Sequence, residues 1–261
     1  MCYDVSFAAG VGTITQYFLD LDINQVDFDP SALLHVQAQA YRKYPVVITG
    51  EQGLQLQLFE WGIIPEYFDT PEKIKKGRSS MCNARSEKII DDKRSYWHRI
   101  RNKRCLVPVT GIFEHREVKG FKNKIPYFIR LRSREMFCLP ALYHYPHKAD
   151  VETGEVTGTF SVVTRAANEL MSKIHNSGDQ AFRMPLFLPK ELELKWLDNN
   201  LPDEEFRSLL EYELPSEELE FHPVFTIRTT KERPDGLTKI DPYKWTNLPE
   251  LGEENKPLTL F

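Results

Sequence analysis

Residues 104–115, RCLVPVTGIFEH, decide the fold class of this chain of 261 residues. Valine, isoleucine and phenylalanine are frequent in the stretch, and these residue types favour the extended backbone of a strand. Comparable runs, each bounded by glycine, proline or charged residues, recur on both sides of it, at residues 44–49, 54–61, 126–131, 136–143 and 159–164. The chain is therefore predicted to be rich in β-strands.

Helical patterns lie between and after these runs. They cover residues 11–21, a stretch after Ala84, and residues 166–175, 189–199 and 203–212. Because strands and helices do not alternate regularly, a doubly wound parallel sheet is disfavoured. We expect an α+β fold, in which a single β-rich domain over residues 1–228 has barrel-like mixed sheets and flanking helices. Residues 229–261 are polar and contain four prolines, so we expect a tail that is wrapped on the body or partly disordered.

The composition is that of an ordinary water-soluble protein, with 41% hydrophobic and 28% charged residues. No apolar run reaches the ~18 residues that a membrane-spanning helix needs, and the N-terminus lacks a secretory pattern. We therefore expect a cytoplasmic protein, and a monomer. The four cysteines lie far apart and form no C-x-x-C pair, so we expect no disulfide framework, no metal site and no cofactor.

Charge is distributed unevenly, although the net charge is only −4. Residues 73–104 contain twelve lysines and arginines against three acids, and residues 201–221 contain eight acids and one arginine. A basic segment can bind phosphates because the field near a surface follows the local charge. A solvated basic helix face is an equally good interpretation.

The chain opens with Met1-Cys2, and removal of Met1 would leave a cysteine whose free amine stands beside its thiol. An α-amine titrates near pH ~8, so a fraction of it is uncharged and nucleophilic at neutral pH. Such a 1,2-aminothiol condenses with an aldehyde: the amine forms a Schiff base, and the thiol then closes a five-membered ring. The alternative is that a cysteine at the second position is accidental.

Three further positions carry side chains suited to binding or acid–base chemistry. Asn83 and Arg85 would point to the same side of an extended stretch and bind a carbonyl and a phosphate, unless Asn83 caps a helix. Glu114 follows an apolar run, so desolvation would raise its pKa towards values useful in catalysis, unless it pairs with an arginine. His175 ends a helix, which favours a protonated imidazole and suits a proton donor, but a plain helix-ending histidine is as consistent.

Arginine and aromatic side chains near these positions are candidates for contact with nucleic acid. Arg183 could reach a phosphate or simply pair with an acid. Trp61, Tyr67 and Phe68 cluster in WGIIPEYF and could stack on unpaired bases, although such residues more often belong to the core.

The order of these motifs resembles the SOS response-associated peptidase (SRAP) family, from residue 2 to about residue 224. The matching stretches are the N-terminal MC, WGIIP, NARSE, RCLVPVTGIFE, PYFI, TRAANELMSKIH, RMP and HPV. The family captures abasic sites in single-stranded DNA covalently. The resemblance implies the same function here, because a ring-opened abasic sugar carries the aldehyde that a 1,2-aminothiol requires.

The resemblance also implies roles for individual residues. Cys2 would form a thiazolidine with the sugar after Met1 is lost in an associated autoproteolytic step. Asn83 would orient the cysteine and the sugar, Glu114 would act in N-terminal processing and Schiff-base chemistry, and His175 would move protons. The residues expected to contact the DNA are Arg85, Arg183, Tyr67, Phe68 and Trp61.

Three features depart from the family pattern. Asp4 stands where an arginine is common, and an acid there would repel phosphate. His115 stands where an aromatic residue is frequent, and the loop between His175 and Arg183 is longer than in the compact form of the motif. We expect the chemistry to survive these changes and the details of DNA contact to differ.

Two other functions are consistent with the same residues. The first is an N-terminal-nucleophile or cysteine peptidase acting on peptides in trans, in which Cys2 attacks a carbonyl, His175 is the base and Asn83 stabilises the oxyanion. The second is a non-catalytic nucleic-acid-binding domain that uses residues 73–104. If abasic DNA is the partner, the protein would associate with the nucleoid when it is bound to damage.

Overall fold

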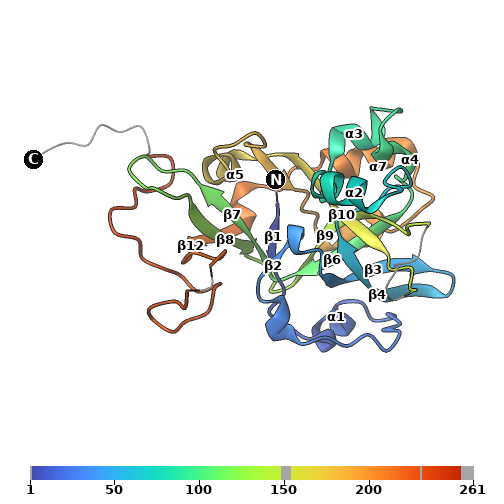
Figure 1. The fold of residues 1–261 in the computed structure, drawn as a ribbon, viewed down its shortest axis with the longest axis horizontal. Helices are drawn as coiled ribbons and strands as arrows, with labels where there is room; N and C mark the ends of the chain where they lie inside the picture. Colours follow the sequence, from blue (N-terminus) through green and yellow to red (C-terminus); the bar gives the residue numbers. More distant parts are fainter. Residues whose placement is uncertain (1, 148–153, 230, 254–261) are drawn as a thin grey trace, which may run out of the picture.

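The structure, a computed structural model, describes residues 2–147, 154–229 and 231–253. Two sheets form its centre (Figure 1). The five-stranded sheet is antiparallel, and its strands, in spatial order, are β12 (Leu219–Pro223), β8 (Ile125–Leu131), β7 (Gly111–Arg116), β1 (Asp4–Ser6) and β2 (Val36–Gln37).

The second sheet closes on itself. Its strands, in spatial order, are β10 (Thr159–Ala166), β4 (Gly53–Trp61), β3 (Lys43–Gly50), β6 (Arg104–Val109) and β9 (Phe137–His144), and β9 pairs again with β10. We call this closed set of five strands the ring. Two short strands, β5 (Asn83–Arg85) and β11 (Arg183–Pro185), pair with β10 near its C-terminal end. The predicted α+β, β-rich fold with barrel-like mixed sheets is confirmed.

Residues 104–115 form two strands rather than one. β6 belongs to the ring, and β7 belongs to the five-stranded sheet, with Thr110 between them. The change of sheet occurs next to Gly111, where a Cβ atom would lie 2.2 Å from the ring of Phe128. Only glycine therefore allows β8 to pack this closely as the chain passes from one sheet to the other.

Short helices surround the sheets. They are α1 (Val11–Tyr17), α2 (Pro71–Gly77), α3 (Ser86–Ile90), α4 (Tyr96–Arg99), α5 (Glu169–Ile174), α6 (Lys190–Trp196) and α7 (Asp203–Glu211). Helix α2 was not predicted; its N-terminus is defined by Thr70, whose side chain accepts a hydrogen bond from the Lys73 N–H. In Figure 1, α2, α3, α4 and α7 gather at one end of the ring, and α1 lies at another side of it.

Residues 231–253 follow the outside of the five-stranded sheet, on the side away from the ring (Figure 1). The indole of Trp245 donates to the Val224 carbonyl (3.0 Å), and Arg116, in β7, donates to the carbonyls of Pro249 (3.0 Å) and Glu250 (2.7 Å). Part of the expected tail is thus packed on the body, among the residues that the structure describes (229 and 231–253). Residues 254–261 lie outside the described part of the chain.

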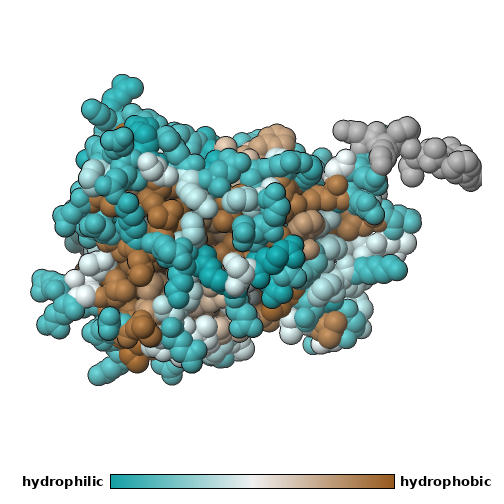
Figure 2. Space-filling view, turned by 180° about the vertical axis from the view of Figure 1, so that it is seen from behind, coloured by the Kyte–Doolittle hydropathy of each residue, from teal (hydrophilic) through white to brown (hydrophobic). Residues whose placement is uncertain are grey.

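Seen from behind, hydrophilic residues cover much of the surface, with apolar areas between them (Figure 2). Within the described ranges, every helix is too short or too polar to cross a membrane.

Candidate active site

The pairing of β1 with β7 brings the N-terminus to Glu114. Asp4 lies opposite Phe113, and continuing this antiparallel register places Tyr3 alongside Glu114 and Cys2 alongside His115. Helix α5 contacts β7 and ends just before His175, so the histidine approaches from the other side. Three elements that are distant in sequence therefore meet at the start of β1.

The Cys2 thiol is completely buried, and Sγ lies 3.8 Å from the carbonyl oxygen of Asp4. Burial raises the pKa of this thiol well above its ordinary value, and the nearby carboxylates of Glu114 and Asp4 add to the effect. The sulfur is therefore protonated at neutral pH and needs a base before it can act as a nucleophile. Met1, whose removal the sequence interpretation requires, lies outside the described residues.

Glu114 and His175 form a close pair of titratable groups. Glu114 is 3% exposed, burial raises its pKa to about 7, and Oε1 has no hydrogen-bond partner among the described residues. Oε2 lies 4.0 Å from Nε2 of His175. The raised pKa expected for Glu114 is confirmed, and its cause is burial beside the apolar strand residues.

His175 is neutral, contrary to the sequence expectation. Burial lowers its pKa to about 4, because desolvation outweighs the effect of the C-terminus of the six-residue helix α5. Nδ1 lies 2.9 Å from the Arg183 carbonyl, which can only accept, so Nδ1 carries the proton and Nε2 offers a lone pair towards Glu114. Between the two pKa values both members of the pair are uncharged, so the acid holds a proton that it can donate and the imidazole has a lone pair that can accept one.

Asn83 presents an unsatisfied carboxamide. It is 5% exposed, and neither Oδ1 nor Nδ2 has a hydrogen-bond partner of good geometry among the described residues, although the Tyr3 hydroxyl is close by. Asn83 does not cap a helix, because the N-cap residue of α3 is Arg85. A buried amide without partners costs free energy, and a bound ligand with a hydroxyl or carbonyl group would satisfy it.

The two candidate phosphate-binding arginines lie on strands that pair with β10. Strand β10 pairs through Thr164 with Arg85 of β5 and through Ala166 with Arg183 of β11. Arg85 is half-buried and donates to the side chain of Gln180 in the loop after His175.

Arg183 is already engaged. Its guanidinium bonds both carboxylate oxygens of Glu87 (2.6 and 3.0 Å) and the Thr164 carbonyl (2.9 Å), and its side chain is 11% exposed. The interpretation of this arginine as the partner of an acid is thus the one observed. A phosphate would have to displace Glu87 to reach it.

The three aromatic candidates separate into different environments. Trp61 is 1% exposed, donates to the Cys82 carbonyl (2.8 Å) and stacks on Phe160 in the core. Its assignment to the DNA-binding surface was wrong, because it has no accessible ring face. Phe68 packs against Gly77, where a Cβ would lie 2.2 Å from its ring, whereas Tyr67 is 46% exposed.

Phe182 is an exposed aromatic residue that the sequence interpretation did not single out. Its ring is 58% exposed, and its φ of +59° is in the left-handed region, which is unusual for a bulky residue. Hydrogen bonds from its N–H to the His175 carbonyl (2.9 Å) and from the Ala167 N–H to its own carbonyl (2.9 Å) hold this conformation. Its position just before the RMP motif was the only signal in the sequence.

Asp4 does not act as the expected repulsive acid. It is 1% exposed, its Oδ1 lies 2.8 Å from Nε2 of His35 and 3.1 Å from Nε of Arg228, and Oδ2 also pairs with the guanidinium. Burial alone would raise the pKa of Asp4, but these hydrogen bonds bring it below its ordinary value. The negative charge is therefore matched inside the protein. No local motif could reveal the partner, because Arg228 is 224 positions away in sequence.

The basic segment, residues 73–104, is not one solvated face. Arg78 is buried, donates to the Gly62 carbonyl (2.9 Å) and pairs with Glu60, and Arg104 is buried as well. The acidic segment, residues 201–221, lies against part of it, where Arg101 and Asp203 are 3.9 Å apart. Two of the twelve cations are thus used inside the fold, whereas eight are exposed.

The remaining cysteines lie inside the protein. Cys82, Cys105 and Cys138 are free, buried thiols. A search of the described residues finds no group of three or more His, Cys, Asp or Glu side chains that could hold a metal ion.

Comparison with known proteins adds three findings. The family model described as SOS response associated peptidase (SRAP) matches residues 1–227. Abasic site processing protein YoqW of Bacillus subtilis (strain 168) is 27% identical over 214 residues, covering 82% of this chain and 87% of that protein. Abasic site processing protein YoaM of the same organism is 30% identical over 183 residues, covering 69% and 73%.

Solved structures have the same fold. A protein from Bacteroides thetaiotaomicron superposes with a TM-score of 0.72 and 30% identity, covering 92% of this chain and 97% of that one. A protein from Bordetella bronchiseptica, at 16% identity, superposes with a TM-score of 0.68 over 86% of this chain and all of that one.

Proposed function

This chain belongs to the SOS response associated peptidase (SRAP) family, and on that premise we propose that it captures abasic sites in single-stranded DNA through a covalent bond to Cys2. The observation that carries the proposal is the meeting of Cys2 with the buried Glu114–His175 pair, while Tyr3, the next residue, lies close to the buried Asn83 amide. The relatives named abasic site processing proteins support this choice of substrate.

The first step is removal of Met1. Hydrolysis of the Met1–Cys2 peptide bond consumes one water, releases methionine and frees the α-amine of Cys2. We assign the proton transfers of this autoproteolytic step to Glu114, whose pKa of about 7 allows it to accept and donate a proton at neutral pH.

The second step is condensation with the sugar. The uncharged amine adds to C1′ of the ring-opened abasic sugar, the resulting hydroxyl takes a proton from Glu114, and water leaves to give a Schiff base. Sγ of Cys2 then adds to the same carbon, and its proton returns to the Glu114 carboxylate. The product is a thiazolidine, one water is lost, and no electron donor or acceptor is needed.

Asn83 and His175 position the sugar in this scheme. The two unsatisfied atoms of the Asn83 amide would pair with the sugar hydroxyl freed by ring opening. Nε2 of His175 offers a lone pair that can accept the proton of that hydroxyl and return it when the adduct reverses. Burial strengthens these interactions because they occur away from water.

Flanking nucleotides would be held without reading their sequence, which suits a lesion that has no base. Arg85 would contact one phosphate, and Arg183 a second after exchanging Glu87 for it. Tyr67 would stack on a neighbouring base, with Phe68 supporting it from behind.

A cysteine peptidase acting in trans is less well supported. Such an enzyme works best with a cysteine held as a thiolate, whereas burial and two acidic neighbours raise the pKa of the Cys2 thiol. A purely electrostatic DNA-binding domain leaves unexplained the neutral, buried Glu114–His175 pair.

The test combines mass spectrometry with a denaturing gel. Wild-type protein of confirmed Cys2 N-terminus should form an adduct with an abasic single-stranded oligonucleotide that survives denaturation. Cys2→Ser keeps the amine, so it should give an adduct only when borohydride reduces the Schiff base. Cys105→Ala, which removes a buried thiol outside the site, should behave as wild type. Absence of any adduct with correctly processed wild type would refute the proposal.

A further inference from the structure

A cationic hollow lies beside the candidate active site and shares His35 with the surroundings of Asp4. Its volume is about 630 Å³, and its lining residues come from two segments, residues 31–42 and residues 225–229 with 231–239. Its charged and titratable lining residues are His35, Arg42, Lys231, Glu232, Arg233 and Lys239. The lining thus has four cations against one acid, although the chain as a whole is negative.

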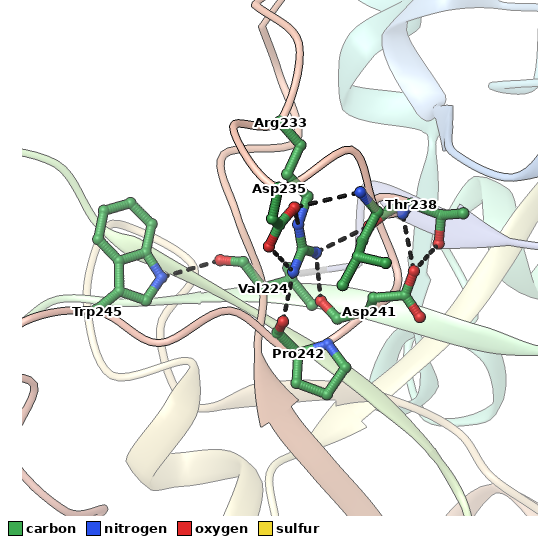
Figure 3. A network of polar contacts seen from close by, with 8 residues as sticks. Val224, Arg233, Asp235, Thr238, Asp241, Pro242 and Trp245 are labelled. Carbon is green, nitrogen blue, oxygen red and sulfur yellow. Dashed lines mark hydrogen bonds and ion pairs between the residues drawn. The ribbon is translucent and has the colours of Figure 1, made fainter.

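One of these cations, Arg233, has a structural role in the lining of the hollow. Figure 3 shows the Arg233 guanidinium bound to the Asp235 carboxylate and to the carbonyls of Thr238, Asp241 and Pro242. The hydrogen bonds from Arg233 to the Thr238 and Asp241 carbonyls measure 2.8 and 2.6 Å. This arginine folds residues 233–242 into a compact turn, and its donors are used for that purpose.

Other cations remain available to a ligand. Arg42 and Lys231 are exposed, and neither forms an ion pair within the part of the chain that the structure describes. Lys239 donates to the Ile227 carbonyl (2.9 Å) and lies 3.4 Å from Nδ1 of His35, so its ammonium stays at the edge of the hollow.

The hollow is joined to the reactive strand by a chain of polar contacts. His35, in its lining, is 2.8 Å from Asp4, which also holds Arg228. Asp4 in turn is two residues from Cys2, and its carbonyl accepts from the Cys2 thiol. The side chain of Arg228 is 41% exposed, so one side of its guanidinium faces solvent between the reactive strand and the hollow.

We propose that Arg228 and the hollow beyond it, with Arg42 and Lys231, bind the phosphodiester backbone of the DNA strand on one side of the abasic site. The inference rests on the proposed function, and it extends the DNA path over a segment that begins where the family match ends, at residue 227. Asp4 is a positioning residue in this scheme, because it holds Arg228 without touching the substrate.

A DNA backbone fits the observations better than a single bound phosphate. The available cations are spread over two chain segments and lead away from Cys2, whereas one anion would be expected to draw them around a single point. Spread charges of one sign are how proteins follow a strand without reading its sequence.

The test measures salt-dependent binding without chemistry. The ligand is a fluorescent single-stranded oligonucleotide with a tetrahydrofuran abasic analogue, which has no aldehyde, and the proteins are wild type, Arg42→Ala/Lys231→Ala, and Lys244→Ala. Lys244 is the control, because it is an exposed lysine of the same C-terminal segment that does not line the hollow. Anisotropy titrations from 50 to 200 mM salt give the slope of log K against log salt.

Each lost phosphate contact should lower that slope by about 0.7 for a single strand. The double variant should therefore lose about 1.4 in slope, which makes its affinity about sevenfold less sensitive to this change of salt. Lys244→Ala should keep the wild-type slope. The difference in slope between the double variant and wild type should vanish when the oligonucleotide is truncated on the side of the lesion that the hollow binds. It should persist when the other side is truncated.

Equal slopes for wild type and the double variant would overturn the inference, as would a deficit that ignores which side is truncated. Thermal melting of each variant checks that the fold is intact. Arg228→Ala is measured in the same way, as a third proposed phosphate contact. Parallel adduct assays on aldehyde-bearing DNA separate the two proposals. If adducts form but the slopes are equal, only the proposal that the hollow binds the DNA backbone is refuted. If no adduct forms, the proposed function is refuted.

Discussion

The Glu114–His175 pair should give the protein a stability that hardly changes between pH 4.5 and 6.5, because its two members titrate in opposite directions. Burial raises the pKa of Glu114 from 4.5 to about 7, so its contribution is fully present below pH 4.5 and is lost as the pH rises towards 7. Burial lowers the pKa of His175 from 6.5 to about 4, so its contribution is present above pH 6.5 and is lost as the pH falls towards 4.

Substituting either residue alone should reveal the pH dependence that this residue gives to the free energy of unfolding. Either shift corresponds to about 3 kcal/mol at 1.36 kcal/mol per pH unit. Glu114→Gln removes the contribution of the acid, so its free energy of unfolding relative to wild type should fall by up to about 3 kcal/mol as the pH drops from 7 to 4.5. His175→Gln removes the contribution of the imidazole, so its free energy of unfolding relative to wild type should fall by a similar amount, about 3 kcal/mol, as the pH rises from 4 to 6.5.

The assay is urea unfolding at half-unit steps of pH, with the free energy extrapolated to water for each protein. Subtracting the wild-type curve cancels the titration of distant groups. Difference curves of opposite slope are the expected result. Two flat difference curves, or two that slope in the same direction, would refute the assignment of a neutral acid beside a neutral imidazole.

Three further results are expected. Asn83→Leu should leave the free energy of unfolding unchanged or higher by about 1–3 kcal/mol, because two unsatisfied buried groups disappear, while adduct formation slows; a clear loss of stability in urea unfolding would contradict this. Glu87→Gln should free Arg183 and tighten binding to single-stranded DNA in anisotropy titrations, whereas unchanged affinity would leave Arg183 a structural residue. Tyr67→Ala should weaken that binding by about 1–3 kcal/mol, and Trp61→Ala should instead destabilise the fold by about 3–5 kcal/mol; the reverse pattern would contradict their assigned environments.

Long apolar runs made the ring predictable from sequence. Ring strands β3, β4, β9 and β10, and strand β8 of the five-stranded sheet, lie where β-branched and apolar residues predicted them. The division of residues 104–115 could not be foreseen, because both halves are apolar and the change of sheet depends on how Phe128 packs over Gly111. Strands β1, β5 and β11 have three residues each, too few for any periodicity to be visible.

The candidate site was predictable only where a motif marks it. Cys2, Asn83, Glu114 and His175 were found from their motifs, and the structure brings Cys2, Glu114 and His175 to the start of β1. Trp61 was misjudged, because its position in a motif does not distinguish a core ring from an exposed one.

Contacts across the whole chain were beyond sequence reasoning. The pairing of Asp4 with Arg228 joins the first residue of β1 to a segment 224 positions further along the chain. The neutrality of His175 results from burial by neighbours that only the fold supplies.

The number of strands that pair with β10 affects which parts of the protein can open locally. It pairs with β4 and β9 within the ring, and with β5 and β11, the two strands that carry Arg85 and Arg183. Opening β10 requires several partners to separate together, whereas the loop after His175 is tied by only a few backbone hydrogen bonds. In hydrogen exchange, β10 should belong to the slowest cooperative unit and that loop to a fast one, so a DNA strand can be admitted without unfolding the platform beneath it.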